Sequence, residues 1–434
     1  MAARPQNLCG YFKRHRPVIR YALNRRLVIA TAVMTAIISP CAQAGCGIDH
    51  GSVRILSNQI DSLRLVAQAA TDCASATVTV TSNHTNRHAN LQIPALTANP
   101  AEYTVAMVSN NSMTSLLNLG LIRPLNELVA RHGGHLKRNQ LVTVGGKVMA
   151  IAFTVDSQQF VYRADILKQA GVEPPRTYEE VLLAAKAIRE RGLMRYPLAG
   201  TYLPDWDLAQ EFINLYQGYG GELFRDGTPV AAIDNQIGIK ALQMMNALSE
   251  FMRPEFLTYN TEIVAPMYEA GEVAMVNIWG SRAGWFMRRD DGTVPAIAAV
   301  TRFGPTPTVG GRVIPATTGW WNGFTIAQNI SDADADASFV AMMHALSPEF
   351  ARAHADAAVW LIDGYEPTPE AAGVLANMRA GIKPYPMTPY MGYLHTAIGL
   401  TIGDYFLKRK TAHRVLADAV ATYSTSARAS GYLP

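Results

Sequence analysis

The stretch that decides the expected fold is residues 146–188, which read GKVMAIAFTVDSQQFVYRADILKQAGVEPPRTYEEVLLAAKAI. Its apolar run, residues 148–155, has the length and β-branched content of a strand. A polar break at residues 156–159 separates this run from a second short apolar piece, residues 160–162. We therefore expect two strands joined by a polar connection.

The same stretch continues into helix. Gly171 ends a short helical segment, and Pro174 and Pro175 form a stiff elbow after it. Thr177 and Glu180 have the spacing of a capping box, in which each side chain accepts a hydrogen bond from the other residue's backbone N–H. The long helix that starts there has its apolar face at helical spacing: Val181, Leu182, Ala185 and Ile188.

This order of strand, polar crossing, strand, Tyr-x-x-Asp turn, Gly-x-x-Pro-Pro-x-Thr elbow and helix resembles the middle of the extracellular solute-binding proteins that deliver sugars to ABC importers. The resemblance implies an α/β fold of the periplasmic-binding-protein-like type II class, with two lobes, mixed or parallel sheets and a multi-strand hinge. It also implies that residues 154–158 cross between the lobes and that Asp156 lies at the cleft wall. A solvated turn is the alternative interpretation of Asp156.

The resemblance extends over about residues 52–430 and predicts how the chain is divided between the lobes. Strands alternate with helices along this length, as in a mostly parallel sheet that helices cover on both faces. Lobe 1 would comprise residues 45–154 and 316–362, and lobe 2 residues 155–315 and the C-terminal helices, residues 363–434. The chain would pass between lobes near residues 154–158, 306–322 and 361–367.

The first 44 residues have the layout of a secretory signal peptide. They contain seven basic residues and no acidic one, then a nearly apolar run at residues 27–38 and the small-x-small site at residues 42–44. That run is shorter than the roughly 20 residues that a membrane span needs. We expect export to the periplasm. A partial twin-arginine pattern at Arg25 and Arg26 leaves the export route open, and a lipoprotein anchored through Cys46 is an alternative.

Charge and cysteine usage both change when the leader is removed. The whole chain has a net charge of +4, whereas 31 basic and 34 acidic residues remain beyond residue 44, a net charge of about −3. No basic patch indicates nucleic acid as a partner. Cys46 and Cys73 also remain, and in an oxidising compartment they could form a disulfide or stay as separate thiols.

Polar side chains follow a predicted strand at residues 103–108, in the segment from Ser109 through Asn110 and Asn111 to Ser112. In open α/β sheets, ligands bind beyond the carboxyl ends of strands. Hydroxyls and carboxamides suit a hydroxyl-rich ligand, and the segment is similar to the first binding loop of the family. A helix N-cap is the simpler interpretation, and both can hold together.

Four tryptophans, Trp206, Trp279, Trp320 and Trp321, stand at predicted loops or strand ends beside Gly, Asn and Asp residues. Sugars present apolar C–H faces that stack on aromatic rings. Core packing is the alternative role. Neighbours on a strand point to opposite faces, so only one of the pair at 320 and 321 can face a ligand. The candidate ligand-binding residues are Asn110, Asn111, Asp156, Asp205, Trp206, Asn277, Trp279, Gly319, Trp320 and Trp321.

Signatures of catalysis or metal binding are absent from the sequence. There is no nucleophile elbow, phosphate loop or His-Glu-x-x-His motif. His84 and His88 have the i, i+4 spacing of metal ligands on a helix, but their polar surroundings favour a solvated loop. Asp205, Asp207 and Asp363 are the carboxylates that a glycoside hydrolase would use; carboxylates also bind sugar hydroxyls without chemistry. We expect neither a cofactor nor a metal.

The sequence therefore predicts an exported, monomeric binding protein that captures a sugar or polyol between two lobes and delivers it to the permease subunits of an ABC transporter. A binding protein for a polyamine or a glycerol phosphodiester is the alternative, and a secreted glycoside hydrolase is more remote. Arg163 replaces an asparagine common in the family, and the apolar Ile278 precedes Trp279 where a polar residue is common. These departures leave the identity of the ligand open.

Overall fold

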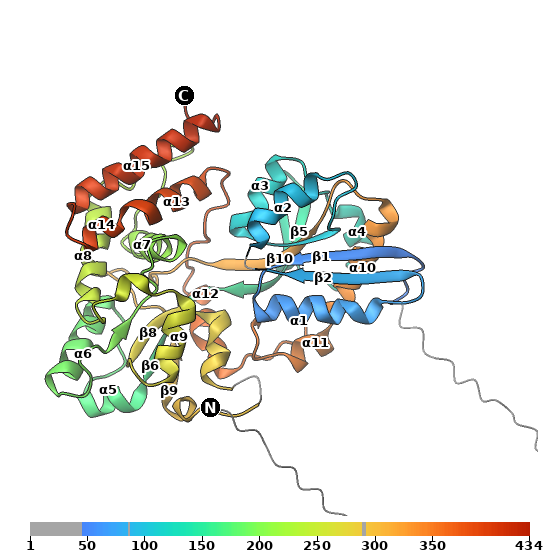
Figure 1. Cartoon of the computed structure of the whole chain (residues 1–434). Coiled ribbons are helices and arrows are strands. Elements are labelled where there is room, and N and C mark those ends of the chain that lie inside the picture. The colour runs from blue at the N-terminus through green and yellow to red at the C-terminus, as the bar shows by residue number, and fades with distance from the viewer. Residues whose placement is uncertain (1–45, 86, 289–291) are drawn as a thin grey trace, which may run out of the picture. The chain divides into compact units, whose positions relative to one another are not determined.

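The computed structural model describes residues 46–434 apart from residue 86 and residues 289–291. The predicted signal peptide, residues 1–44, lies outside the described residues. Two β-sheets organise the described part, and each has its own set of helices (Figure 1). None of the described helices combines the length and the apolar character that a bilayer crossing requires.

The first sheet, with its helices, forms lobe 1. Its seven strands are β1 (Gly51–Ser57), β2 (Val78–His84), β3 (Val105–Ser109), β4 (Leu141–Val144), β5 (Lys147–Asp156), β10 (Trp320–Ile326) and β11 (Val359–Trp360). β1 pairs in parallel with β2 and β3, and β10 is antiparallel to β3 and β5. β4 and β11 pair with different parts of β5. The sheet is therefore mixed.

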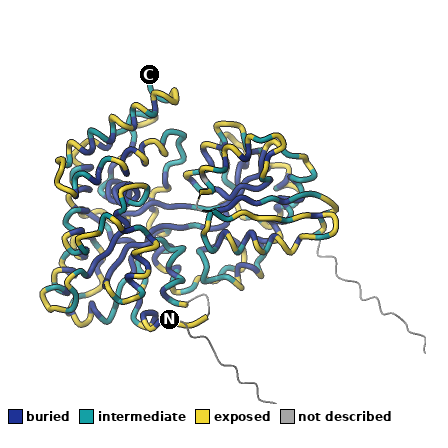
Figure 2. The backbone as a smooth tube through the Cα atoms, viewed as in Figure 1, coloured by how far each residue is buried: buried dark blue, intermediate teal, exposed yellow. Residues whose placement is uncertain are grey.

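The second sheet belongs to lobe 2 and has four strands in the order β7, β8, β6, β9. Their bounds are β6 (Gln158–Arg163), β7 (Leu198–Ala199), β8 (Met275–Trp279) and β9 (Thr301–Gly304). β6 is antiparallel to both of its neighbours, whereas β7 and β8 run in parallel. Figure 2 shows that the central strands of both sheets are largely buried, while the outer faces of the helices are exposed.

Helices cover both sheets. Those of lobe 1 are α1 (Asp61–Ala70), α2 (His88–Thr97), α3 (Asn110–Asn118), α4 (Asn126–His132), α10 (Asp332–Ala345) and α11 (Pro348–Ala353). Those of lobe 2 are α5 (Ala164–Ala170), α6 (Tyr178–Glu190), α7 (Trp206–Gly218), α8 (Gln236–Ser249), α9 (Thr261–Glu269), α12 (Ala372–Arg379), α13 (Met391–Thr401), α14 (Gly403–Phe406) and α15 (Ala412–Ala429). The arrangement is the α/β architecture expected from the alternation of strands and helices.

Strand β3 shows why helices cover both faces of the first sheet. Its side chains alternate between the faces of the sheet. Val105 and Met107 pack in one cluster with α1 and α10, whereas Ala106 and Val108 pack in another with α2 and α3. All four residues are buried, so β3 is apolar on both faces, as a strand covered on both sides must be.

The chain passes between the two sheets three times. β5 ends at Asp156 in the first sheet and β6 begins at Gln158 in the second, with Ser157 alone between them. The second passage joins β9 to β10, and the third leads from β11 to α12, which packs on β6 and β9. Several connecting segments of this kind allow two lobes to open and close by small changes in backbone dihedral angles.

Two local predictions have opposite outcomes. The capping box is confirmed: Thr177 Oγ1 accepts a hydrogen bond from the Glu180 backbone N–H (3.1 Å), and Glu180 Oε2 accepts one from the Thr177 N–H (3.3 Å).

The solvated loop predicted around His84 and His88 is wrong at both histidines. Parallel pairing with β1 continues β2 through His84, and α2 begins at His88.

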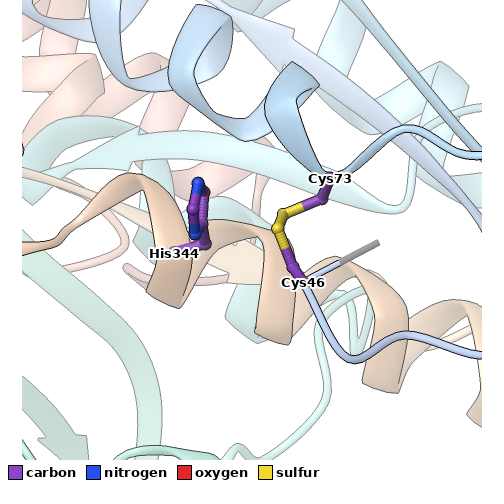
Figure 3. A group of neighbouring side chains, drawn as sticks. All are labelled: Cys46, Cys73 and His344. Carbon is purple, nitrogen blue, oxygen red and sulfur yellow. A yellow bond between two sulfur atoms is a disulfide. The ribbon is translucent and has the colours of Figure 1, made fainter. Parts of the chain in front are cut away.

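A disulfide attaches the start of the described chain to lobe 1. Cys46 Sγ lies 2.03 Å from Cys73 Sγ, and His344 of α10 lies beside the pair (Figure 3). Cys73 is fully buried in the core of lobe 1. Because the disulfide engages both sulfurs, the three residues offer a metal ion one imidazole and no thiolate. The group is therefore structural.

Replacing Cys46 and Cys73 together by serine should lower the free energy of unfolding by about 2 to 4 kcal/mol, because a cross-link between residues 27 positions apart restricts the unfolded chain. Urea unfolding of the wild type and of the double variant measures the difference in the free energy of unfolding. Dithiothreitol is the control: it should bring the wild-type midpoint down to that of the double variant and leave the variant unchanged. Equal midpoints in oxidising buffer would contradict the prediction.

Candidate functional site

A cleft of about 440 Å³ is lined by residues of both lobes. Lobe 1 contributes the segments that follow the carboxyl ends of β1 and β3, together with residues of β10. Lobe 2 contributes the first turns of α7 and α9 and the end of β8. The parallel strands β1 and β3 thus end at the cleft, which is where ligands bind in α/β sheets of this kind.

Three tryptophans form one wall of the cleft. The ring centroid of Trp206 lies 5.9 Å from that of Trp279 and 5.6 Å from that of Trp320, and the rings of Trp279 and Trp320 are 5.7 Å apart. The three residues come from α7, β8 and β10, so both sheets contribute to the wall. Tilted and edge-to-face contacts at these distances hold each ring in place.

Buried groups support this wall from behind. The imidazole of His395 stacks on Trp206 with centroids 4.9 Å apart, and the ring of Tyr385 lies 4.1 Å from that of Trp320. The Tyr385 hydroxyl and His395 Nδ1 are 2.8 Å apart, and His395 Nε2 lies 2.9 Å from the Trp206 carbonyl oxygen. Burial lowers the pKa of His395 to about 4. The imidazole is therefore neutral near pH 7, and it donates from Nε2 and accepts at Nδ1.

Two carboxyl groups of the lining have raised pKa values. Burial raises the pKa of Asp156 to about 6, against hydrogen bonds from Ser281 and the Ser157 N–H and the charge of Arg282. Burial also raises the pKa of Asp207 to about 7. The negative charges of Glu211, Glu262 and Asp205 add to that second shift. Each carboxyl group therefore lacks full compensation for its charge.

A buried polar network lies behind the cleft, at the passages between the lobes. Gln158 Nε2 donates to Glu211 Oε1 (2.8 Å), and Gln158 Oε1 accepts from Asn214 (2.8 Å) and Asn277 (3.1 Å). The Gln158 carbonyl oxygen accepts from Thr306 Oγ1 (2.7 Å) and Asn377 Nδ2 (2.8 Å). Gln158 thus binds groups from α7, β8, α12 and the second passage.

The network also reaches the aromatic wall. Asn214 Oδ1 accepts a hydrogen bond from the Thr318 backbone N–H (3.1 Å), and Trp320 Nε1 donates to Thr318 Oγ1 (3.0 Å). Gln210 Nε2 donates to the same hydroxyl at 2.9 Å. The orientation of the Trp320 indole is therefore linked to α7 through the second passage.

The structure divides the ten candidate residues into two groups. Five line the cleft: Asn111, Asp156, Trp206, Trp279 and Trp320. The other five are not among the lining residues: Asn110, Asp205, Asn277, Gly319 and Trp321. On β10, Trp320 faces the cleft and its neighbour Trp321 packs on the core beside α3, as the alternation of side chains on a strand requires.

The two asparagines outside the lining have structural contacts instead. Asn110 Oδ1 accepts a hydrogen bond from the Trp321 backbone N–H (2.9 Å), and its amide nitrogen donates to the Gly319 and Tyr385 carbonyl oxygens (3.4 and 3.3 Å). Asn277 Nδ2 lies within hydrogen-bonding distance of Gln158 and the Tyr178 hydroxyl. Both side chains are buried. Each amide holds a chain passage in position rather than facing the cleft.

Asp205 and Gly319 are outside the lining for different reasons. Asp205 is exposed at the N-cap of α7, one residue before Trp206. Gly319 is buried in the second passage, where its N–H donates to the Lys383 carbonyl oxygen (2.8 Å). Neither residue is presented to the cleft.

Sequence reasoning did not select several polar lining residues: Asn58, Gln59, His88, Asp207, Glu262, Ser281, Arg282 and Asn322. Asp207 was considered only as a hydrolase carboxylate, although it follows Trp206 directly. His88 lines the cleft with a pKa lowered to about 4 by burial, so its ring is neutral near pH 7. The signal that could have found most of these residues is their place just after a strand end or at a helix start.

Comparison with known proteins identifies one family. A sequence profile of the family described as bacterial extracellular solute-binding protein matches residues 66–351. A protein of Deinococcus radiodurans, named as a probable ABC transporter-binding protein, is 26% identical over 170 residues, or 38% of this chain and 40% of that protein. The match thus spans about two fifths of that curated relative.

Solved structures show the same fold. Maltose-bound MalE3 of T. maritima has a TM-score of 0.72 and is 18% identical over 86% of this chain and 99% of its own. A solute-binding protein of Agrobacterium radiobacter K84 in complex with ribitol has a TM-score of 0.73 and 17% identity, over 87% and 99% of the two chains. One of Agrobacterium vitis S4 with bound D-mannitol has a TM-score of 0.70 and 17% identity, over 88% and 99%.

Replacing Glu211 by glutamine should flatten the pH dependence of stability. Burial raises the pKa of Glu211 from 4.5 to about 7, so the folded protein binds this proton more tightly than the unfolded chain does. The stability gained from that proton is complete below pH 4.5 and is lost as the pH rises through about 7. The wild type should therefore lose on the order of 2 to 3 kcal/mol more than Glu211→Gln between about pH 5 and about pH 8.

Urea unfolding at those two pH values measures the effect, and the exposed Glu173→Gln is the control. The control should follow the wild type. Parallel stability curves for wild type and Glu211→Gln would contradict a buried, uncompensated carboxyl group at this position.

Proposed function

Since the chain belongs to the bacterial extracellular solute-binding protein family, we propose that it captures a sugar or polyol in the cleft between its lobes and delivers it to the permease subunits of an ABC transporter. The protein would act after export, in the periplasm, as a monomer and without a cofactor or a catalytic step. We also propose that its two lobes are divided as predicted from the sequence.

One observation carries this proposal: the wall made by Trp206, Trp279 and Trp320 faces a cleft whose other lining groups are largely polar. The C–H face of a sugar or polyol packs against indole rings, while its hydroxyl groups need donors and acceptors around them. Asn111 on lobe 1 and Asp156 at the first passage supply such groups. We propose these five residues as ligand contacts.

Closure of the cleft gives the protein its transport role. A ligand stabilises the closed form only by contacts that the open form lacks. Residues of both lobes line this cleft, so a ligand that contacts both would favour closure. The permease would then recognise the closed form.

The non-sugar alternatives make different demands on the lining. A glycerol phosphodiester needs free cationic groups, yet Arg282, the one Lys or Arg among the described lining residues, lies 3.7 Å from Glu262. A polyamine would use the acidic groups but leave the amides and hydroxyls of lobe 1 without hydroxylated partners. The relatives described with ribitol, D-mannitol and maltose also favour the hydroxylated class.

A thermal-shift screen of the purified protein against sugars, polyols, polyamines and phosphodiesters tests the proposal. We expect sugars or polyols to raise the melting temperature, because a ligand that binds only the folded state stabilises it. A shift with polyamines or phosphodiesters alone would reject the sugar or polyol assignment.

For the ligand that the screen selects, Trp279→Ala should weaken binding by about tenfold or more, a loss of at least roughly 1.4 kcal/mol. The matched control is Trp321→Ala, which removes a tryptophan that packs outside the cleft. Its affinity should stay within about threefold of the wild type. Isothermal titration calorimetry measures both, and equal losses in the two variants would contradict the proposed stacking wall.

A further inference from the structure

We infer that the ligand is a hydroxylated compound that carries a positive charge, such as an amino sugar or an amino polyol, with its ammonium group at Asp207 beside Trp206. This inference rests on the proposed function and narrows its ligand class. Two features of the cleft carry it: the unequal distribution of charge between the two lobes, and a carboxyl group that has no cationic partner in the protein.

Charge is concentrated on the lobe 2 side of the cleft and at the first passage between the lobes. Lobe 2 presents Asp207 on α7, Glu262 on α9 and Arg282 after β8, and Asp156 lies at the first passage. The polar residues from lobe 1 are uncharged amides and hydroxyls: Asn58, Gln59, Ser109, Asn111, Ser112 and Asn322. The remaining polar residue of lobe 1, His88, is neutral near pH 7 because burial lowers its pKa to about 4.

Arg282, the one Lys or Arg among the lining residues that the structure describes, is already engaged. Arg282 lies 3.7 Å from Glu262, its guanidinium stacks 4.6 Å over the ring of Trp285, and its charge also lowers the pKa of Asp156. Its side chain is only 15% exposed. With three carboxyl groups against one guanidinium, the lining has an excess of negative charge once its acids are ionised.

Asp207 is the group left without compensation. No Lys or Arg among the residues described forms an ion pair with it, and Glu211, Glu262 and Asp205 all repel its charge. A neutral sugar would leave this repulsion in place. A ligand ammonium would remove it, because opposite charges a few ångströms apart in a partly desolvated cleft attract strongly.

The aromatic wall is suited to the same cation. Trp206 is adjacent to Asp207 at the start of α7, and its ring lies 5.9 Å from that of Trp279 at a tilt of 37°. Indole faces attract ammonium groups through their negative electrostatic potential. The hydroxyl groups of the ligand would then face the uncharged amides and hydroxyls of lobe 1. This match separates an amino polyol from a plain polyamine, which has no hydroxyl groups for that side.

Matched ligand pairs test the inference: sorbitol against 1-amino-1-deoxysorbitol, and glucose against glucosamine. Calorimetry near pH 7, where the ammonium groups of both amines are largely protonated, should find the amine bound at least about tenfold more tightly than its neutral partner in each pair that binds. Asp207→Asn should abolish most of that preference, measured as the ratio of the amine's affinity to that of its neutral partner. The control Asp205→Asn removes the neighbouring carboxyl group, which lies outside the lining, and should retain the preference.

The affinity for 1-amino-1-deoxysorbitol, whose ammonium group stays protonated over this range, should also rise between about pH 6 and about pH 8, because the pKa of Asp207 is raised to about 7 and the carboxylate binds an ammonium better than the acid does. The titratable or charged groups around Asp207 are Asp205 and Glu211 on its own element, Glu262 on α9, and the lining groups Asp156, Arg282 and His88. The Asp207→Asn variant should lose the greater part of this rise.

The outcomes separate the two proposals. Tight binding of sorbitol or glucose with no preference for the amine would overturn the inference and leave the proposed function intact. A preference for the amine that survives in Asp207→Asn would also overturn it, because another residue would then bind the ligand's ammonium group. Binding of spermidine with no response to either hydroxylated pair would overturn both, and so would the absence of binding by every compound.

Discussion

The buried hydrogen-bond network around Gln158 is the constraint on which the arrangement of the lobes depends. The side chain and backbone of Gln158 are fully buried where β5 ends and β6 begins, and a buried polar group without a partner costs about 1 to 3 kcal/mol. Partners from α7, β8, α12 and the second passage remove that cost together. These hydrogen bonds thereby tie the passages between the lobes to lobe 2.

This constraint limits where the lobes can rotate. Breaking the network would leave several buried amides unpaired, so a low-energy motion must keep it intact. The residues free to change their dihedral angles are those on the lobe 1 side of it, where β5 and β10 pair at Asp156 and Trp320. That pair lines the cleft. A hinge at this place would share residues with the cleft wall, and a ligand bound against Trp320 would act directly on it.

Much of the fold and part of the site could be predicted from the sequence. Periodicity and capping identified the long helix after Thr177, because those signals are local. The tryptophans at strand ends were found for a similar reason. The sequence could not predict which face of β10 points to the cleft. Alternation requires Trp320 and Trp321 to point to opposite faces, but it does not say which of them faces the cleft. The sequence also could not show that Asn110 and Asn277 lie outside the cleft lining, because an amide that supports a chain passage has the same sequence context as one that binds a ligand.

The cleft lining holds two carboxyl groups whose charged forms are disfavoured by burial in the folded protein. Burial raises the pKa values of both Asp156 and Asp207, so the protein retains these acids at some cost to stability near neutral pH. Groups of this kind persist where a ligand supplies the missing compensation. Because most of the charge lies on lobe 2 and most of the neutral polar groups lie on lobe 1, a charged, hydroxylated ligand of the proposed kind would find half of its partners on each lobe. Closure would satisfy both halves, and that difference in affinity would favour the closed form.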